Sequence, residues 1–276
     1  MTHLPRTADI GIEGTISDTS RLNRLLGVAA VVLAAALVWI AASGLRWPAR
    51  AAVVSLLTLL PVALAAQGRQ LEALPAEVPR IAIYASSAAA LWMLAGLVLL
   101  AAVTSGFSPA ALGLRAIPPG PLLSWTVGVT AGGLLLLALS RALGVCESPM
   151  LLRLLPRSGA ERLAFAALSA TAGVTEELVF RGFLIPALET ALGSAWFAAV
   201  LSSLVFGFLH GYQQTPGMLR AGILGFGLAL PLIMTRSLLP AILAHTAYDI
   251  VAGVFLARLW LRTEEAGTWP RDAGIG

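Results

Sequence analysis

The chain has 276 residues, of which 58% are hydrophobic and only 12% are charged, and its formal net charge at pH 7 is +4. A soluble domain carries about twice that share of charged residues, so this composition leaves too little polar material to cover a soluble globule of this size. The same numbers exclude an intrinsically disordered chain, and the single cysteine, Cys146, excludes a disulfide framework. Nucleic acid is excluded as a partner, because the arginines are spread over many short loops and form no basic stripe.

Apolar segments that are long enough to cross a bilayer recur along the chain. Residues 1–24 are polar and of mixed charge, and we interpret them as a cytoplasmic tail rather than a cleaved signal peptide. We predict about eight spans, at residues 25–43, 51–66, 81–103, 122–140, 162–188, 194–212, 217–235 and 238–260. Each span is expected to be a helix, since lipid offers no partner for backbone polar groups. The fold class is therefore an all-α, polytopic transmembrane helix bundle with the lipid bilayer as its partner.

Arginine placement predicts the orientation of these spans. All 18 basic residues are arginine, and most of them fall in the segments on the same side as the N-terminus. Arg220, which falls near the start of the seventh predicted span, is counted on that side. Because cytoplasmic loops carry the excess of positive charge, both termini are expected in the cytoplasm. Exclusive use of arginine in an alanine-rich chain indicates a GC-rich coding background, and we expect a bacterial plasma-membrane protein.

Ionisable residues inside spans are confined to the C-terminal half of the chain. The predicted spans contain no Asp, Glu, Arg or His up to position 161. Beyond it a cluster of ionisable residues lies in the spans or, for Glu189, at the end of one: Glu176, Glu177, Arg181, Glu189, His210, His245 and Asp249. Since a charge within a span costs a few kcal/mol, such residues indicate a functional site by default. We therefore divide the chain into the tail 1–24, N-terminal helices 25–121, a chemically equipped core 122–262 whose C-terminal helices are expected to form the cavity of the site, and a tail 263–276.

The acidic pair of the fifth predicted span has a spacing that favours one ion pair and one free carboxylate. Glu177 and Arg181 are four residues apart with the acid first, which is the better orientation for an ion pair on a helix. Glu176 lies about 100° around the helix from Glu177, so the two carboxylates point in different directions. A charge group that only supports helix packing is the alternative, but such a group needs no second carboxylate.

Two histidines lie in later spans, and each has a notable side chain one helical turn away. His210 follows Phe206 by one helical turn, and His245 precedes Asp249 by one turn. An acid at that spacing can hold the tautomer of the imidazole, or share a proton or a metal with it. Each group by itself is explained by a buried hydrogen bond. Three spans that each contribute such groups favour a common site.

These residues carry a resemblance to a known family. The stretch 176–181 (EELVFR) resembles the EExxxR motif of the CPBP family of intramembrane proteases, which includes CAAX prenyl endopeptidases and bacteriocin-processing proteases. The stretches 206–210 and 245–249 resemble its FxxxH and HxxxN/D motifs in the same order. The resemblance extends over about residues 122–260. It implies an endopeptidase that cleaves a membrane-associated peptide or protein substrate.

The resemblance also implies roles for individual residues. Glu176 and His210 would activate a water molecule, while His245 and Asp249 would stabilise the oxyanion. The bracing residues implied by the family are Glu177, Arg181 and Phe206. This division agrees with the chemistry of amide hydrolysis, which needs a base next to the attacking water and donors aimed at the tetrahedral oxygen.

Residue 249 departs from the family pattern, and the cofactor is left open. The better-studied relatives have asparagine where this chain has Asp249, and an ionised carboxylate only accepts hydrogen bonds. Asp249 can therefore act in its protonated form, orient His245, or bind a metal. No HExxH helix is present. The candidate zinc ligands are Glu176, His210, His245 and Asp249, and we favour a glutamate mechanism in which the metal is optional.

Two other functions remain as alternatives to the protease. Glu, His and Asp in late spans are also typical of a proton-coupled transporter, but the sequence shows no pair of homologous halves. A catalytically silent scaffold or immunity protein of the same fold is the second alternative, and the intact set of Glu176, His210 and His245 argues against it.

The predicted spans raise one geometrical difficulty. If the last three spans were ideal and complete, His210 would lie near one membrane face. His245 would then lie only about 10 Å from the opposite face, at 1.5 Å per residue. For the two histidines to share a site, the middle helix must be tilted or broken, or the last helix must begin deep in the bilayer.

Overall fold

The computed structural model describes residues 12–72, 79–257 and 261, and every regular element in these ranges is a helix. The elements are α1 (Ile12–Ala41), α2 (Trp47–Val54), η1 (Ser55–Leu59), α3 (Leu60–Glu72), α4 (Arg80–Thr104), α5 (Pro119–Ala142), α6 (Pro149–Leu154), α7 (Gly159–Glu176), η2 (Glu177–Leu184), α8 (Ile185–Leu192), α9 (Ala195–Leu209), η3 (Gly211–Gln213), α10 (Gln214–Thr235), α11 (Leu239–Ile250) and η4 (Val251–Leu256). The predicted all-α class is confirmed. Of the predicted tails 1–24 and 263–276, residues 1–11 and the whole C-terminal tail lie outside the described residues, whereas residues 12–24 form the first part of α1.

Six of these helices are long and apolar enough to cross a membrane. They are Trp47–Ala66, Arg80–Thr104, Pro119–Ala142, Gly159–Leu192, Gly211–Thr235 and Leu239–Leu256. The other two predicted spans correspond to shorter apolar helices, Leu25–Ala41 and Ala195–Leu209. All eight predicted segments are therefore helical, while the number that cross the bilayer stays a prediction. The short helix α6 was not predicted.

Local capping chemistry divides the long apolar stretch in the C-terminal half. A capping box begins α7, where Ser158 and Glu161 each bond the other's backbone N–H. At the far end α8 stops at Gly193, whose φ of 73° suits a residue without a side chain. The next residue, Ser194, accepts a hydrogen bond from the backbone N–H of Phe197 and starts α9. The chain therefore reverses between α8 and α9.

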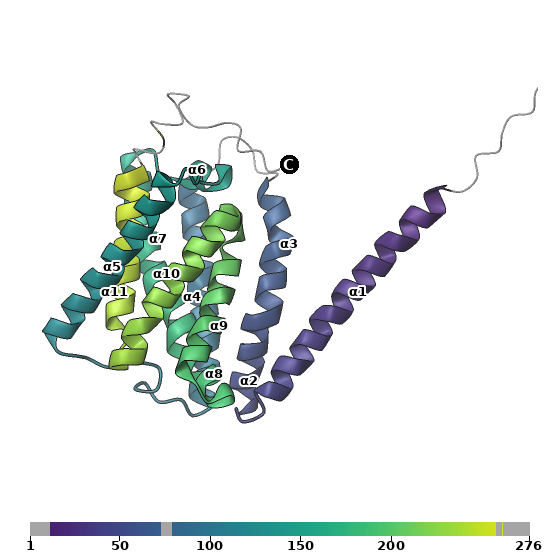
Figure 1. The fold of residues 1–276 in the computed structure, drawn as a ribbon, viewed down its shortest axis with the longest axis horizontal. Coiled ribbons are helices and arrows are strands. Elements are labelled where there is room, and N and C mark those ends of the chain that lie inside the picture. The colour runs from purple at the N-terminus through teal and green to yellow at the C-terminus, as the bar shows by residue number, and fades with distance from the viewer. Residues whose placement is uncertain (1–11, 73–78, 258–260, 262–276) are drawn as a thin grey trace, which may run out of the picture.

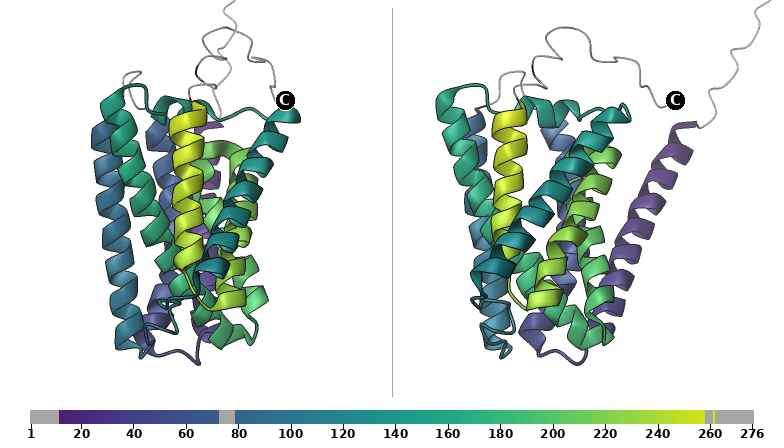
Figure 2. Two further views of the ribbon diagram at one scale, coloured as in Figure 1. Left: turned by 90° about the vertical axis from the view of Figure 1, so that its left-hand side faces the viewer. Right: turned by 60° about the vertical axis from the view of Figure 1, so that its left-hand side comes forward.

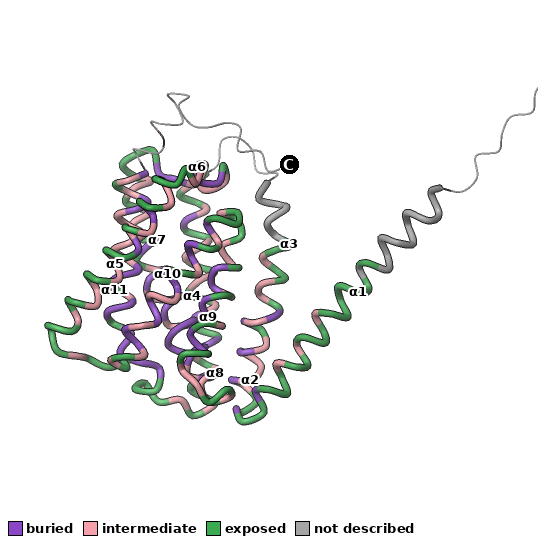
Figure 3. Tube along the Cα trace, viewed as in Figure 1, coloured by how far each residue is buried: buried purple, intermediate pink, exposed green. Residues whose placement is uncertain are grey.

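Helix α1 leans away from the bundle formed by the other helices (Figure 1). The right-hand turned view shows the same divergence, together with the steep crossing of α5 over the yellow α11 (Figure 2). Burial is concentrated in the C-terminal elements, whereas the outer helices are mostly exposed (Figure 3). In a membrane protein these exposed apolar faces, such as Leu33 on α1, contact lipid.

The N-terminal helices pack around the segment that follows the acidic pair. Phe183 and Leu184 of η2 are completely buried, and they share one apolar cluster with Val53 of α2, Leu56 of η1 and Val98 of α4. The first predicted spans thus remove η2 and α8 from solvent and lipid. Burial of this apolar surface, worth about 25 cal/mol per Å², holds η2 in place.

Helices α7 and α11 approach each other most closely at a glycine. A Cβ atom built on Gly173 would lie 2.1 Å from Oγ1 of Thr246 and 3.1 Å from the carbonyl oxygen of Ile242. Because only a residue without a side chain allows this approach, Gly173 brings the end of α7 next to the first turns of α11.

His210 and His245 lie closer together along the bundle axis than three complete, ideal spans would allow. Helix α9 has only 15 residues, or about 22 Å, and the corner between α9 and α10 lies below α6 rather than at the end of the bundle (Figure 1). Since α9 ends inside the bundle, His210 can reach the level of His245, the seventh residue of α11.

We expect Gly173→Ala to destabilise the protein by about 1–3 kcal/mol, the usual cost of overpacking a well-packed contact. The added methyl group has no room between α7 and α11. Thermal unfolding in detergent measures the effect.

Gly96→Ala in α4 is the matched control, because nothing lies within 4 Å of the position of its added Cβ. This variant should be as stable as the parent or slightly more stable, since alanine favours the helix. Equal melting temperatures for Gly173→Ala and the parent would contradict the close α7–α11 contact.

Candidate active site

The predicted catalytic residues lie where helices end or change geometry. Glu176 is the last residue of α7, and Glu177 begins the π-helical segment η2. His210 follows the last residue of α9, whereas His245 and Asp249 lie on α11 just before a second π-helical segment, η4. Such segments occur frequently at functional sites, because the wider turn changes the direction of side chains.

Glu177 is the most heavily shared polar group of the site. Its Oε1 accepts a hydrogen bond from Nη1 of Arg181 at 2.8 Å and lies 2.8 Å from Nδ1 of His245. Nη2 of Arg181 donates to the carbonyl of Gly225 at 2.9 Å. Both Glu177 and Arg181 are completely buried. The ion pair expected from their spacing is therefore present, and His245 is a third member that the spacing did not predict.

The contact with Glu177 sets the orientation of the His245 ring. A carboxylate only accepts hydrogen bonds, so Nδ1 of His245 carries a proton and donates it. Nε2 then points to Glu176 and Asp249, at 3.9 Å from Oε2 and 3.7 Å from Oδ2 respectively. The sequence suggested that Asp249 could hold the tautomer, but the bond to Nδ1 comes from Glu177.

The carboxylates of Glu176 and Asp249 are more exposed than that of Glu177. The side chains of Glu176 and Asp249 are 17% and 30% exposed, whereas that of Glu177 is fully enclosed. As expected from the helical geometry, one carboxylate of the acidic pair is tied to Arg181 and the other is open. Glu176 and Asp249 are therefore open to small molecules that need not displace the buried ion pair.

Phe206 lies in contact with the charged groups and with both histidines of the site. The guanidinium carbon of Arg181 is 4.3 Å from the centre of the Phe206 ring, which is a cation–π contact. The ring centres of His210 and His245 lie 4.6 and 6.0 Å from that of Phe206. Phe206 thus fixes the spacing between these residues.

His210 has one nitrogen bound to the backbone and one free to act. Its Nδ1 lies 2.8 Å from the carbonyl oxygen of Phe206. A carbonyl oxygen only accepts, so Nδ1 carries the proton. In the neutral ring Nε2 is then an acceptor.

The candidate zinc ligands do not form a ready ligand set. Within the described ranges, no three His, Cys, Asp or Glu side chains are arranged to hold a metal ion. Nδ1 of His245 is engaged by Glu177 and Nδ1 of His210 by the Phe206 carbonyl, which leaves only one nitrogen on each ring. Zinc at this site stays a prediction.

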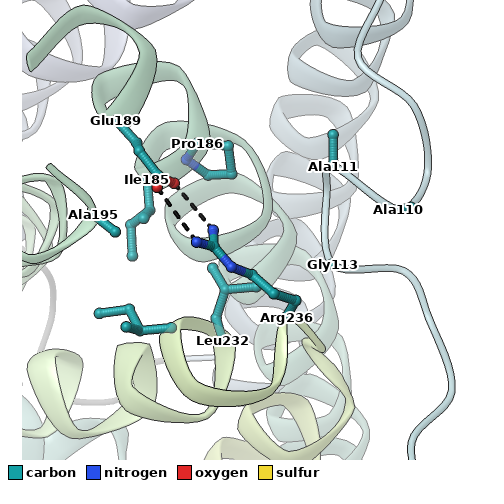
Figure 4. Close-up of a pocket in the computed structure, with 10 residues that line it drawn as sticks. Ala110, Ala111, Gly113, Ile185, Pro186, Glu189, Ala195, Leu232 and Arg236 are labelled. Carbon is teal, nitrogen blue, oxygen red and sulfur yellow. Dashed lines mark hydrogen bonds and ion pairs between the residues drawn. The ribbon is translucent and has the colours of Figure 1, made fainter. Parts of the chain in front are cut away.

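Glu189, a further acid of the C-terminal half, lies away from this site. It pairs with Arg236, whose Nη1 is 3.2 Å from Oε2 of Glu189. Figure 4 shows the two side chains bonded across a small pocket that also includes Pro186 and Leu232. The pair is partly exposed, and we assign it no catalytic part.

One buried ion pair was missed by the sequence analysis. Nη2 of Arg220 donates to Oε2 of Glu147 at 2.6 Å, and both residues are buried. The sequence analysis only counted Arg220 among the arginines of the cytoplasmic side and gave it no partner, whereas the structure places it within α10. The signal was available: an arginine inside the apolar segment 217–235 calls for a partner.

We expect Glu177→Ala and Arg181→Ala each to lower the free energy of unfolding by about 3–5 kcal/mol, because either change leaves a buried charge without its partner. Thermal or denaturant unfolding in detergent measures this loss.

The partly exposed ion pair of Glu189 and Arg236 provides the control. Arg236→Ala should cost less than about 1 kcal/mol, as is usual for surface ion pairs. If Glu177→Ala were as stable as Arg236→Ala, the buried pair would not have the supporting role given to it here.

Comparison with protein families gives one match for this chain. Residues 159–251 match the family described as Type II CAAX prenyl endopeptidase Rce1-like. This segment runs from α7 to the start of η4 and holds all three motifs, although it is shorter than the stretch of about 122–260 inferred from the motifs alone. Comparison with curated proteins and with solved structures gives no match. The matched segment, less than half of the chain, is therefore similar to the CAAX-type proteases of this family, in agreement with the resemblance of its motifs.

Proposed function

We propose that this protein is an intramembrane endopeptidase that hydrolyses a peptide bond in a membrane-associated peptide or protein. The observation that carries the proposal is the arrangement around His245. One ring nitrogen is fixed by the buried Glu177, and the other faces the accessible carboxylates of Glu176 and Asp249. A base, a proton-carrying ring and a second acid thus converge on one point inside the bundle.

Glu176 is the general base of this proposal. Its carboxylate is accessible and carries no ion pair with Arg181, so it can accept a proton from water as the water oxygen attacks the scissile carbonyl. The free Nε2 of His210 is a second acceptor that can orient the same water molecule. The proton held by Glu176 then passes to the leaving amine nitrogen when the carbon–nitrogen bond breaks.

His245 and Asp249 stabilise the tetrahedral intermediate. In its doubly protonated form the His245 ring donates from Nε2 to the developing oxyanion, while Nδ1 stays bonded to Glu177. Asp249 in its acid form supplies a second donor, as the asparagine of related proteins would. Donors that are held in place before the reaction stabilise the transition state at little cost in reorganisation.

The geometry favours the protease over the other two functions. Glu176, Glu177, His245 and Asp249 gather at one point, whereas a proton-coupled transporter needs ionisable groups along a pathway across the membrane. A silent scaffold would not require an accessible base beside an oriented imidazole.

We expect Glu176→Gln to reduce cleavage by at least about 100-fold, as loss of a general base does, with little change in thermal stability. The assay uses the full chain in liposomes and an internally quenched, S-farnesylated peptide ending in a CAAX sequence, the substrate class that the family description names. Glu189→Gln, away from the site, should cleave at the parental rate. Substantial cleavage by Glu176→Gln would show that Glu176 is not the base.

Asp249→Asn distinguishes a hydrogen-bonding role from a metal-binding role. If Asp249 acts as a donor, the amide donates in its place and most of the activity should remain. If Asp249 is a metal ligand, bound zinc and activity should fall together. Elemental analysis and cleavage rates of both proteins separate the two cases, and an active parent without metal would exclude the ligand role.

A further inference from the structure

Two neighbouring residues outside the family-matched segment reach the elements that carry the site. Glu147 and Ser148 lie in the connector between α5 and α6 and are buried. Oγ of Ser148 donates to the carbonyl of Tyr212 at 2.8 Å and also caps α6. Glu147 accepts the hydrogen bond from Arg220 at 2.6 Å.

Each of these contacts ends close to a catalytic residue. Tyr212 lies in η3, two residues after His210. Arg220 lies one turn before Leu224 on α10, and Leu224 packs in one apolar cluster with Tyr248, the residue before Asp249. One connector therefore reaches, directly or through α10, the corner that holds His210 and the turn of α11 that holds Asp249.

Tyr248 is confined on its other side. A Cβ atom built on Gly133 of α5 would lie 2.9 Å from the Tyr248 ring and 2.9 Å from Leu224 of α10. Since the ring has no room to move toward α5, its packing with Leu224 of α10 restrains the side chain. A shift of α10 at Arg220 would be transmitted through Leu224 to Tyr248 and hence to its neighbour Asp249.

Stability alone does not explain the Glu147–Arg220 pair. Its side chains are only 2% and 8% exposed, and Oε1 of Glu147 is buried with no hydrogen-bond partner among the described residues. Desolvation offsets much of the attraction in such a pair, so an apolar pair of similar size is often equally stable. A buried polar group that is left incompletely bonded calls for another explanation.

We propose that Glu147, Ser148 and Arg220 form a connector clamp that positions His210 and Asp249 for catalysis. The clamp residues are positioning residues that do not touch the substrate. This inference rests on the proposed function for its effect on cleavage, but the placement itself can be tested without cleavage.

The double variant Glu147→Leu/Arg220→Met removes the charges and keeps an apolar contact. Using the farnesylated CAAX peptide and the full chain in liposomes, we expect kcat to fall about 10–100-fold, the scale of a small misplacement of reacting groups. KM should not change, and the melting temperature should stay near that of the parent. The matched control, Glu189→Leu/Arg236→Met, removes the ion pair at the other end of the bundle and should leave kcat unchanged.

Ser148 gives an independent test of the same clamp. Ser148→Ala removes the hydroxyl that reaches Tyr212 and should lower kcat, whereas Ser148→Thr keeps a hydroxyl and should restore it. If the contact were purely structural, Ser148→Ala would lower thermal stability but would not lower kcat at an unchanged KM.

Hydrogen–deuterium exchange measures placement without cleavage. In the Glu147→Leu/Arg220→Met variant we expect faster exchange in residues 205–214 and 244–252, with α8 unchanged. Parental kcat and parental exchange would overturn the clamp and leave the proposed protease intact. A parent that cleaves no probe, together with faster exchange confined to these segments, would instead contradict the protease and support the placement.

Discussion

The arrangement of the site depends on one oxygen atom, Oε1 of Glu177, which bonds both Arg181 and His245. The carboxylate is completely enclosed, and a charge in such surroundings is tolerated only with a close partner. Arg181 supplies that partner, and the Gly225 carbonyl and the Phe206 ring support its guanidinium. With the charge balanced, Glu177 can fix the ring of His245.

The packing of the bundle makes this contact possible. Gly173 allows α7 and α11 to approach closely, and the apolar cluster around Phe183 and Leu184 encloses η2 with helices from the N-terminal half. The N-terminal helices carry no candidate catalytic residue, but they remove water from around the Glu177–Arg181 pair. A low dielectric strengthens the ion pair and also the electrostatic stabilisation of a transition state.

The chemistry of the site lies at the edge of this closed region. Glu176 and Asp249 are accessible, and each lies within 4 Å of Nε2 of His245. The division of labour follows from helix geometry: adjacent residues such as Glu176 and Glu177 point about 100° apart. Glu177 can therefore be buried with Arg181 while Glu176 stays partly exposed.

The sequence by itself determined the helical class, the eight apolar segments, the charged C-terminal half and the Glu177–Arg181 pair. These features depend on local composition and on spacings of three or four residues, which helical periodicity fixes. Only the tertiary structure decided that Glu177 rather than Asp249 binds Nδ1 of His245, that the short α9 brings His210 to the site, and that Arg220 pairs with Glu147. The two contacts join residues 68 and 73 positions apart, and the place of His210 depends on where α9 stops. Neither follows from local periodicity, because packing between helices sets them.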